Sequence, residues 1–330
     1  MPTRLVLAAA AIALTTLGCQ LLRAPLRPSV PALPEMRQID DVAYRDDVDA
    51  DPKKHRLDLY LPARAKGDAP TPVLVFVHGG GWRTGDKDLK QLGVTPYIDI
   101  GRFYAQHGFV VVVPNYRLPP ATWRDQVDDV ADAVAWTYRN ITAHDGDPAR
   151  IFVGGHSAGA QLATRVALDR ALLHERDADP DAICGVLAIS GGGYDLADEQ
   201  TYDLGARRSY YTEIFPEAEW TEASPVTYLD ASAPPFLVLS ARGEWPSLHH
   251  QNRLLADALA DAGADARNVA LTSGSARVAM AAHISTLLGL VQLDDDADLS
   301  DPAVEGTSAP HALAFLRDGG RCNPIDRAGD

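Results

Sequence analysis

A serine flanked by glycines stands where a predicted strand meets a predicted helix. The segment "GGHSAG" (154–159) contains the pattern G-x-S-x-G around Ser157. This spacing is typical of a sharp strand-to-helix turn, in which small flanking residues let the neighbouring backbone approach closely. The hydroxyl then lies at a helix N-terminus, where developing negative charge is favoured. The pattern therefore predicts that Ser157 is a nucleophile.

A glycine-rich turn follows another predicted strand. The segment "VLVFVHGGGW" (73–82) lacks both G-x-G-x-x-G and the lysine of a Walker motif, so it does not match the common phosphate-binding loops. Consecutive glycines can instead turn backbone amides toward one point and stabilise an oxyanion. We expect the N–H groups of Gly80, Gly81 and Ala158 to form this oxyanion hole. His78 is expected to support the loop rather than to titrate in catalysis.

Several segments occur in the order and spacing of the α/β-hydrolase superfamily. They are "HGGGWRTGDK", "VVVPNYRL", "DDVADAVAWTYRN", "DPARIFVGGHSAG" and "ISGGGYDL". The resemblance covers about residues 40 to 320. It is greatest to the esterase and lipase branch related to hormone-sensitive lipase, kynurenine formamidase and bacterial feruloyl-esterase-like carboxylesterases. It implies a serine hydrolase that acts on carboxylic esters without a metal or an organic cofactor.

A serine nucleophile needs a general base, and the base needs a carboxylate that orients it. The resemblance implies the chain order serine, acid, histidine. The base is then expected at His283, after the last predicted strand, and the acid at Glu244, in the turn after "FLVLS". Asp195 is the alternative acid, in which case Glu244 is an exposed surface residue. The adjacent His249 and His250 are interpreted as the start of a helix without a catalytic role.

Nearly continuous apolar runs alternate with helix-like patterns along the chain. The runs are typical of strands buried on both faces, and they lie at 73–77, 109–114, 151–155, 183–190 and 236–240. An alternating segment at 55–62 predicts an early antiparallel strand and 267–272 a last strand, with helices at 123–139, 157–173 and 246–262. This alternation predicts a mostly parallel sheet covered on both sides. With the resemblance, it implies an α/β-hydrolase fold with an eight-stranded sheet.

The long connection 191–234 is rich in aromatic residues. A connection of this length is either a lid-like insertion over a site or a surface excursion that its own aromatic residues pack down. Trp82, Tyr194 and Trp245 are candidates to line an acyl or aryl pocket, with simple packing as the alternative. The segment "NYRL" (115–118) is expected to pack beneath the oxyanion loop.

The N-terminal segment differs from the rest of the chain. Residues 1–18 hold one early cation and a short apolar run, which is the layout of an export signal. Gly18 and Cys19 resemble a bacterial lipobox, and this resemblance implies acylation of Cys19 and a membrane-anchored lipoprotein of the bacterial envelope. Release as a periplasmic or secreted protein, and a retained anchor, are the alternatives. Residues 19–38, with a Pro-rich stretch, would form an extended tether.

After the tether, we expect a catalytic domain over residues 39–320 and a short C-terminal tail over residues 321–330. Only Cys184 and Cys322 follow Cys19 in this chain, so a disulfide-dense scaffold is excluded. Cys184 opens an apolar run and is expected to be a buried strand cysteine. A bridge between Cys184 and Cys322 is the alternative in an oxidising compartment.

The sequence therefore predicts a serine carboxylesterase that forms an acyl-enzyme on Ser157 with a small-molecule ester. An amidase or formamidase would use the same groups, and a catalytically silent binding protein on this fold is a rival from another class. The formal net charge of −15 argues against a nucleic-acid-binding surface.

Overall fold

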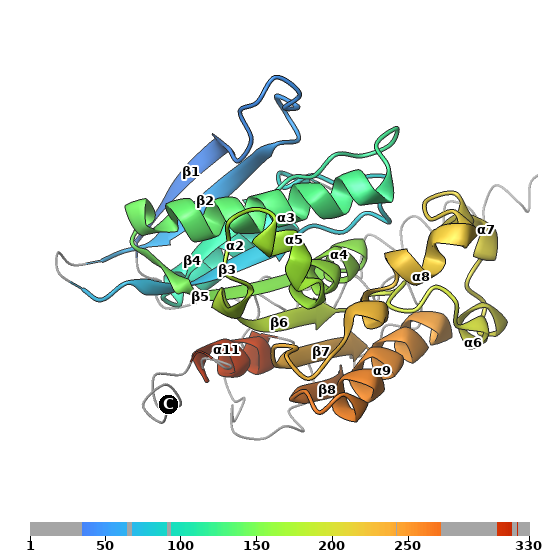
Figure 1. The fold of residues 1–330 in the computed structure, drawn as a ribbon. Coiled ribbons are helices and arrows are strands. Elements are labelled where there is room, and N and C mark those ends of the chain that lie inside the picture. Colours follow the sequence, from blue (N-terminus) through green and yellow to red (C-terminus); the bar gives the residue numbers. More distant parts are fainter. Residues whose placement is uncertain are drawn as a thin grey trace, which may run out of the picture. The chain divides into compact units, whose positions relative to one another are not determined.

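The computed structural model describes residues 35–64, 68–90, 94–241, 243–271, 309–318 and 322. Within them an eight-stranded sheet has the order β1-β2-β4-β3-β5-β6-β7-β8 (Figure 1). The strands are β1 (Met36–Ala43), β2 (Arg56–Pro62), β3 (Thr71–Val77), β4 (Val110–Pro114), β5 (Gly146–His156), β6 (Ile183–Ile189), β7 (Phe236–Ala241) and β8 (Ala266–Leu271). The β1–β2 and β2–β4 pairs are antiparallel and the other pairs are parallel.

Helices cover both faces of this sheet. The helices are α2 (Pro96–Gln106), α3 (Trp123–Asn140), α4 (Ala158–Leu168), α5 (Arg170–His174), α6 (Glu199–Asp203), α7 (Arg208–Thr212), α8 (Trp220–Ala223), α9 (Pro246–Asp261) and α11 (Ala309–Arg317). Buried residues of α3, α4 and α9 form one hydrophobic core, and those of α2 and α11 form a second. Because both faces are covered, every residue of β4 and β6 is buried, which explains their continuous apolar runs.

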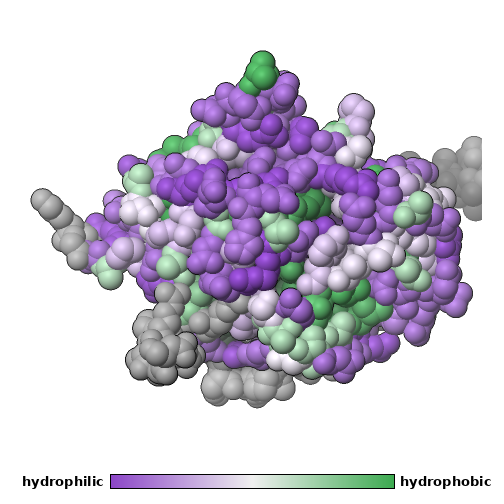
Figure 2. All heavy atoms as spheres, viewed as in Figure 1, coloured by the Kyte–Doolittle hydropathy of each residue, from purple (hydrophilic) through white to green (hydrophobic). Residues whose placement is uncertain are grey.

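Hydrophilic residues dominate the face drawn in Figure 2, in keeping with the 45 acidic residues of the chain. In the described ranges, we find no helix with the length and apolar character needed to span a bilayer.

Several elements differ from the sequence-based prediction. β1 was not predicted, because its alternation is interrupted by a bulge at Asp41, which has a positive φ of 58°. This strand begins at Met36, inside the segment 19–38 predicted as a tether. The single helix predicted over 157–173 is wrong: Asp169 ends α4, and its carboxylate accepts a hydrogen bond from the Ala171 N–H at the start of α5.

Cys184 at the start of β6 and Cys322 form a disulfide, with their Cα atoms 5.1 Å apart. The prediction of an unpaired buried cysteine is therefore wrong, and the alternative of a bridge is confirmed. Burial of Cys184 within an apolar strand was predicted correctly. The sequence identified the possible partner but could not show that the two residues meet, because 138 positions separate them.

Candidate active site

Ser157 occupies the sharp turn between β5 and α4. It has φ 56° and ψ −124°, a positive φ that is strained for a residue with a side chain. The turn is stabilised by a hydrogen bond of 2.9 Å from the Ser157 N–H to the Ile189 carbonyl at the end of β6. Ser157 is only partly buried, so its hydroxyl can be reached from outside.

The flanking glycines explain the spacing of the G-x-S-x-G motif. A Cβ atom on Gly155 would lie 2.5 Å from the backbone of Gly159. A Cβ atom on Gly159 would lie 2.2 Å from the Val77 carbonyl oxygen. Because only hydrogen fits at these positions, the start of α4 packs directly against the end of β3, which leads into the glycine-rich loop.

The glycine-rich loop lies beside the serine. A Cβ atom on Gly79 would be 3.2 Å from the Ser157 Cβ, so the two turns are in close contact. Gly80 and Gly81 have φ values of 131° and 60°, which side chains disfavour. The structure thus brings Gly80, Gly81 and Ala158, the first residue of α4, to the same place as Ser157.

The base of this loop is supported by buried aromatic residues. The His78 ring stacks on Tyr116, with centroids 4.2 Å apart and planes 16° from parallel. The Tyr116 hydroxyl donates to the His78 carbonyl at 3.2 Å, and the Gly79 N–H donates to the Tyr97 hydroxyl at 2.7 Å. Asn115 accepts a hydrogen bond of 2.7 Å from the Lys87 N–H. The expected packing of "NYRL" beneath the oxyanion loop is therefore confirmed for Tyr116.

His78 supports the loop in its neutral form. Its Nδ1 lies 2.8 Å from the Gly79 carbonyl, which can only accept, so Nδ1 carries the proton. Complete burial lowers the pKa of His78 from 6.5 to about 4. The imidazole is thus uncharged near pH 7, as expected for a supporting residue.

This lowered pKa predicts that acid destabilises the fold through His78. Above pH 6.5 the residue is neutral in the folded and unfolded states, and it adds no pH dependence. Between pH 6.5 and pH 4, His78 binds a proton in the unfolded chain but not in the folded protein. The free energy of unfolding therefore decreases as the pH is lowered through this range. The difference between the pKa of 6.5 in the unfolded chain and about 4 in the folded protein corresponds to a loss of about 3 kcal/mol in the free energy of unfolding.

Urea unfolding of the wild type and of His78→Asn at several pH values tests this prediction. We expect the acid-induced loss to be smaller in the variant, whatever its stability at pH 7. Parallel pH dependence in the two proteins would contradict it.

Glu244 lies in the turn between β7 and α9 and is only 6% exposed. The alternative of an exposed surface glutamate is therefore wrong. Its carboxylate accepts a hydrogen bond from the Ser190 hydroxyl. Ser190 directly follows Ile189, the residue that accepts the Ser157 N–H. Glu244 is thus connected to the nucleophile turn through the end of β6.

The competing acid and the two adjacent histidines have other partners. The Asp195 carboxylate accepts from the Ala197 N–H at 2.9 Å and organises its own loop. His249 and His250 both lie on α9, as predicted. The His249 Nδ1 is 3.1 Å from the Ser240 hydroxyl, and the His250 Nε2 is 2.8 Å from the Asp198 carboxylate. Two predicted site residues, His283 and Cys19, lie outside the described residues.

A cavity of about 1170 Å³ opens above Ser157. Besides the serine and the glycine-rich loop, it is lined by the aromatic residues Trp82, Tyr97, Tyr210, Tyr211 and Trp245. Trp82 and Trp245 thus lie where an acyl or aryl pocket was predicted, and their role in substrate binding stays a prediction. Tyr194 is fully buried and is not among the described residues that line the cavity, so its prediction as a pocket residue is wrong.

The insertion 191–234 forms α6, α7 and α8, which Figure 1 shows grouped at one end of the sheet. It contributes Arg207, Tyr210 and Tyr211 to the cavity wall. Other aromatic residues, Phe215 and Trp220, are buried and pack the insertion onto the core. Sequence reasoning missed the roles of Tyr210 and Tyr211 in the wall, although the aromatic content of the insertion was the signal that pointed to them.

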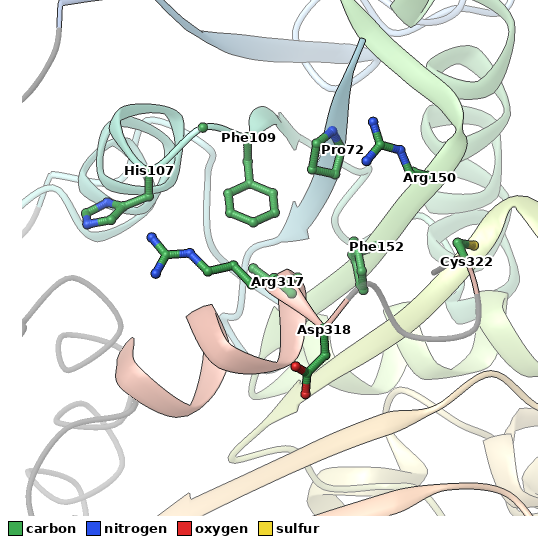
Figure 3. Close-up of a pocket in the computed structure, with 10 residues that line it drawn as sticks. Pro72, His107, Phe109, Arg150, Phe152, Arg317, Asp318 and Cys322 are labelled. Carbon is green, nitrogen blue, oxygen red and sulfur yellow. The ribbon is translucent and has the colours of Figure 1, made fainter. Parts of the chain in front are cut away.

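A second, smaller cavity of about 270 Å³ lies near the amino ends of β3 and β4 and beside α11 (Figure 3). Two of its charged residues have ion-pair partners: Arg150 pairs with Asp147 at 2.7 Å, and Asp318 pairs with Arg267 at 3.0 Å. Ligands of open α/β sheets bind at the carboxyl ends of the strands, where Ser157 lies. Across the described part of the chain, no cluster of three His, Cys, Asp or Glu side chains could hold a metal ion.

Comparison with known proteins agrees with this geometry. The BD-FAE family model matches residues 57–259, from β2 to α9, which is more than half of the 330 residues. The chain belongs to the BD-FAE family. The match includes Ser157, the glycine-rich loop and Glu244.

Curated relatives of this BD-FAE protein include isoprenylcysteine alpha-carbonyl methylesterase ICME of Arabidopsis thaliana. It is 30% identical over 240 residues, which are 68% of this chain and 54% of the relative. Esterase LipQ of Mycobacterium tuberculosis is 30% identical over 223 residues, which are 64% of this chain and 51% of the relative. The chain thus spans about half the length of these two relatives, and 37% of a probable isoprenylcysteine methylesterase, ICMEL1, of Oryza sativa subsp. japonica.

Solved structures resemble this BD-FAE chain over most of its length. Esterase B from Lactobacillus rhamnosis has a TM-score of 0.58 at 20% identity, covering 83% of this chain and 85% of that one. The esterase of the archaeon Pyrobaculum calidifontis has a TM-score of 0.55 at 22% identity, covering 72% and 74%. These likenesses show that the fold is that of the α/β-hydrolases.

Proposed function

We propose that this protein is a serine carboxylesterase that hydrolyses small-molecule esters through an acyl-enzyme on Ser157. The observation that carries the proposal is the strained Ser157 turn, which lies against the glycine-rich loop at the floor of a large cavity. The curated relatives are esterases by name, which supports ester hydrolysis over the amidase and binding-protein alternatives.

In the proposed mechanism, the Ser157 Oγ forms a bond to the ester carbonyl carbon while its proton moves to a general base. We propose His283 as this base, and the resemblance to the α/β-hydrolases supports that choice. The carbonyl oxygen becomes an oxyanion, which the N–H groups of Gly80, Gly81 and Ala158 stabilise. Buried Glu244 orients the base and stabilises its charged form.

Collapse of the tetrahedral intermediate breaks the ester C–O bond, and the base returns the proton to the leaving alcohol. Water then repeats the sequence on the acyl-enzyme and releases the acid together with free Ser157. The aromatic cavity wall supports substrates with an apolar or aryl acyl group, because such walls bind apolar surface.

A substrate panel on the purified protein tests this function. It should contain p-nitrophenyl esters of increasing acyl length, feruloyl and acetyl-sugar esters, and a matched p-nitroanilide. We expect hydrolysis of esters and covalent labelling of Ser157 by a fluorophosphonate. Faster cleavage of the anilide would favour an amidase, and a protein that neither reacts with the probe nor cleaves an ester is a binding protein.

We also propose that the protein is exported and acylated at Cys19. The Cys184–Cys322 disulfide supports export, because disulfides persist in oxidising compartments. Palmitate labelling in a bacterial host should mark the wild type, and the label should disappear in Cys19→Ala together with membrane association. An unlabelled wild type would contradict acylation: membrane association would then favour a retained anchor, and its absence periplasmic or secreted release.

A further inference from the structure

The glycine-rich loop is held from above by the insertion as well as from below by the core. The Tyr210 hydroxyl, at the middle of α7, donates to the Gly81 carbonyl at 3.1 Å. A Cβ atom on Gly81 would lie only 1.9 Å from this hydroxyl oxygen. The tyrosine therefore packs directly on the backbone of Gly81, one of the two glycines assigned to the oxyanion hole.

Arg83 fixes Tyr210 in this position. Its guanidinium lies over the Tyr210 ring, 4.7 Å from the centroid. It also donates to the Tyr210 carbonyl at 3.1 Å and pairs with Glu213 at 2.6 Å. Arg83 thus binds the ring, the backbone and the end of α7. This clamp reduces the conformational freedom of the tyrosine that contacts Gly81.

The residue between them is held in the same way. Trp82 has a positive φ of 59°, and its ring packs edge-on against Phe215, with centroids 5.1 Å apart. Its indole N–H donates to Gln161 of α4 at 3.1 Å, and Gln161 donates to the Ala223 carbonyl of the insertion at 3.1 Å. Three consecutive residues, 81 to 83, therefore contact the insertion.

These contacts act on the glycine segment of the predicted oxyanion hole. The Gly80 carbonyl accepts hydrogen bonds from the N–H groups of Arg83 and Thr84 at 3.2 and 3.0 Å, and these bonds orient the peptide before Gly81. Gly81 has no side chain to restrict its backbone, so the peptide after it depends on a partner for its own carbonyl. A hydrogen bond to the Gly81 carbonyl fixes the plane of the peptide that follows it and limits rotation about Gly81. Donors stabilise an oxyanion well only when they are already aligned before reaction.

We propose that Tyr210 is a positioning residue that aligns the oxyanion-hole amides by holding the Gly81 carbonyl. This inference rests on the proposed function and deepens it, because it gives the insertion a part in catalysis. Tyr210 also lines the cavity, so the rival role is direct contact with the substrate. The two roles differ in kinetics: alignment of the oxyanion hole changes kcat, whereas uniform substrate binding changes KM.

The test compares Tyr210→Phe with Tyr202→Phe in the full chain. Tyr202 is a matched control, because its hydroxyl also donates to a backbone carbonyl, that of Leu196 at 2.7 Å. Both partners of this second bond belong to the insertion, and Tyr202 is half-buried and absent from the cavity lining. Each substitution therefore removes one tyrosine hydroxyl from α6 or α7, and only one of them touches the glycine-rich loop.

We measure kcat and KM for a soluble p-nitrophenyl ester and the affinity for an aryl trifluoromethyl ketone. The ketone carbon bonds to the Ser157 Oγ, the serine proton moves to the base, and the ketone oxygen becomes an oxyanion. For Tyr210→Phe we expect kcat to fall about 10-fold or more, since small misplacements around a transition state cost up to about 100-fold. KM should change less than about 3-fold, and ketone affinity should fall as kcat does.

Tyr202→Phe should retain the wild-type kcat and ketone affinity. An unchanged kcat in Tyr210→Phe overturns the proposal, as does a raised KM at constant kcat. An equal loss in Tyr202→Phe also overturns it, because general packing of the insertion would then explain the effect. In all three cases the wild type remains an esterase, and only the role of Tyr210 fails. A wild type without esterase activity overturns both the proposed function and this inference.

Discussion

Substitution of Ser157 by alanine should lower kcat/KM for p-nitrophenyl ester hydrolysis by about 10⁴-fold or more. The substitution removes only the hydroxyl group, and without it no acyl-enzyme can form. Residual turnover would then come from direct attack of water on an ester held in the cavity, with the oxyanion hole still stabilising the oxyanion. The fold should be unchanged, because alanine keeps the Cβ atom and the backbone hydrogen bond to Ile189 that stabilises the turn.

Circular dichroism and the melting temperature verify the fold of Ser157→Ala. Ser209→Ala is a suitable control, since Ser209 is an exposed serine of α7 that does not line the cavity. It should retain full activity and fluorophosphonate labelling. Wild-type turnover in Ser157→Ala would show that the nucleophile has been assigned to the wrong residue.

The second large effect is expected for Glu244→Gln, with a fall in kcat of about 10³- to 10⁴-fold. Glutamine has nearly the same shape, and its amide oxygen can still accept the hydrogen bond from Ser190. It lacks the negative charge that stabilises a protonated histidine in the transition state. The loss should therefore appear in kcat while the melting temperature changes little.

Two companion variants identify the acid. Glu244→Asp keeps the charge but shortens the side chain by one methylene, so we expect a smaller loss than in Glu244→Gln. Asp195→Asn should retain most of the activity, because the Asp195 carboxylate contacts the Ala197 N–H of its own loop. If Asp195→Asn is inactive and Glu244→Gln is active, Asp195 is the acid.

The sheet was predictable from sequence wherever burial on both faces produced a continuous apolar run. β3, β4, β6 and β7 are such strands, and each was predicted close to its observed bounds. β1 is an edge strand with a bulge, and its half-exposed residues follow no simple alternation. The helix α2 was not predicted either, since Gly101 weakens the helical pattern of its sequence. A glycine stands there because the ring of Tyr60 packs against the helix backbone.

The site was predictable where backbone geometry restricts residue type. Gly155 and Gly159 are required by close backbone approach, so the motif identifies the Ser157 turn without a structure. The cavity wall has no such requirement. Tyr210 and Tyr211 are adjacent in α7, yet one is 38% exposed and the other 7% exposed. Tertiary packing of the insertion decides that difference, and no local pattern reports it.

The position of Cys322 in the chain limits when the disulfide can form during synthesis of the protein. Cys322 follows all eight strands in sequence, so the bond to Cys184 can close only after the ribosome has synthesised the whole sheet. The bond then joins the chain beyond α11 to β6, and separation of these segments would require it to be reduced. The bond thus adds to the finished protein a covalent constraint that is absent while the chain is being synthesised.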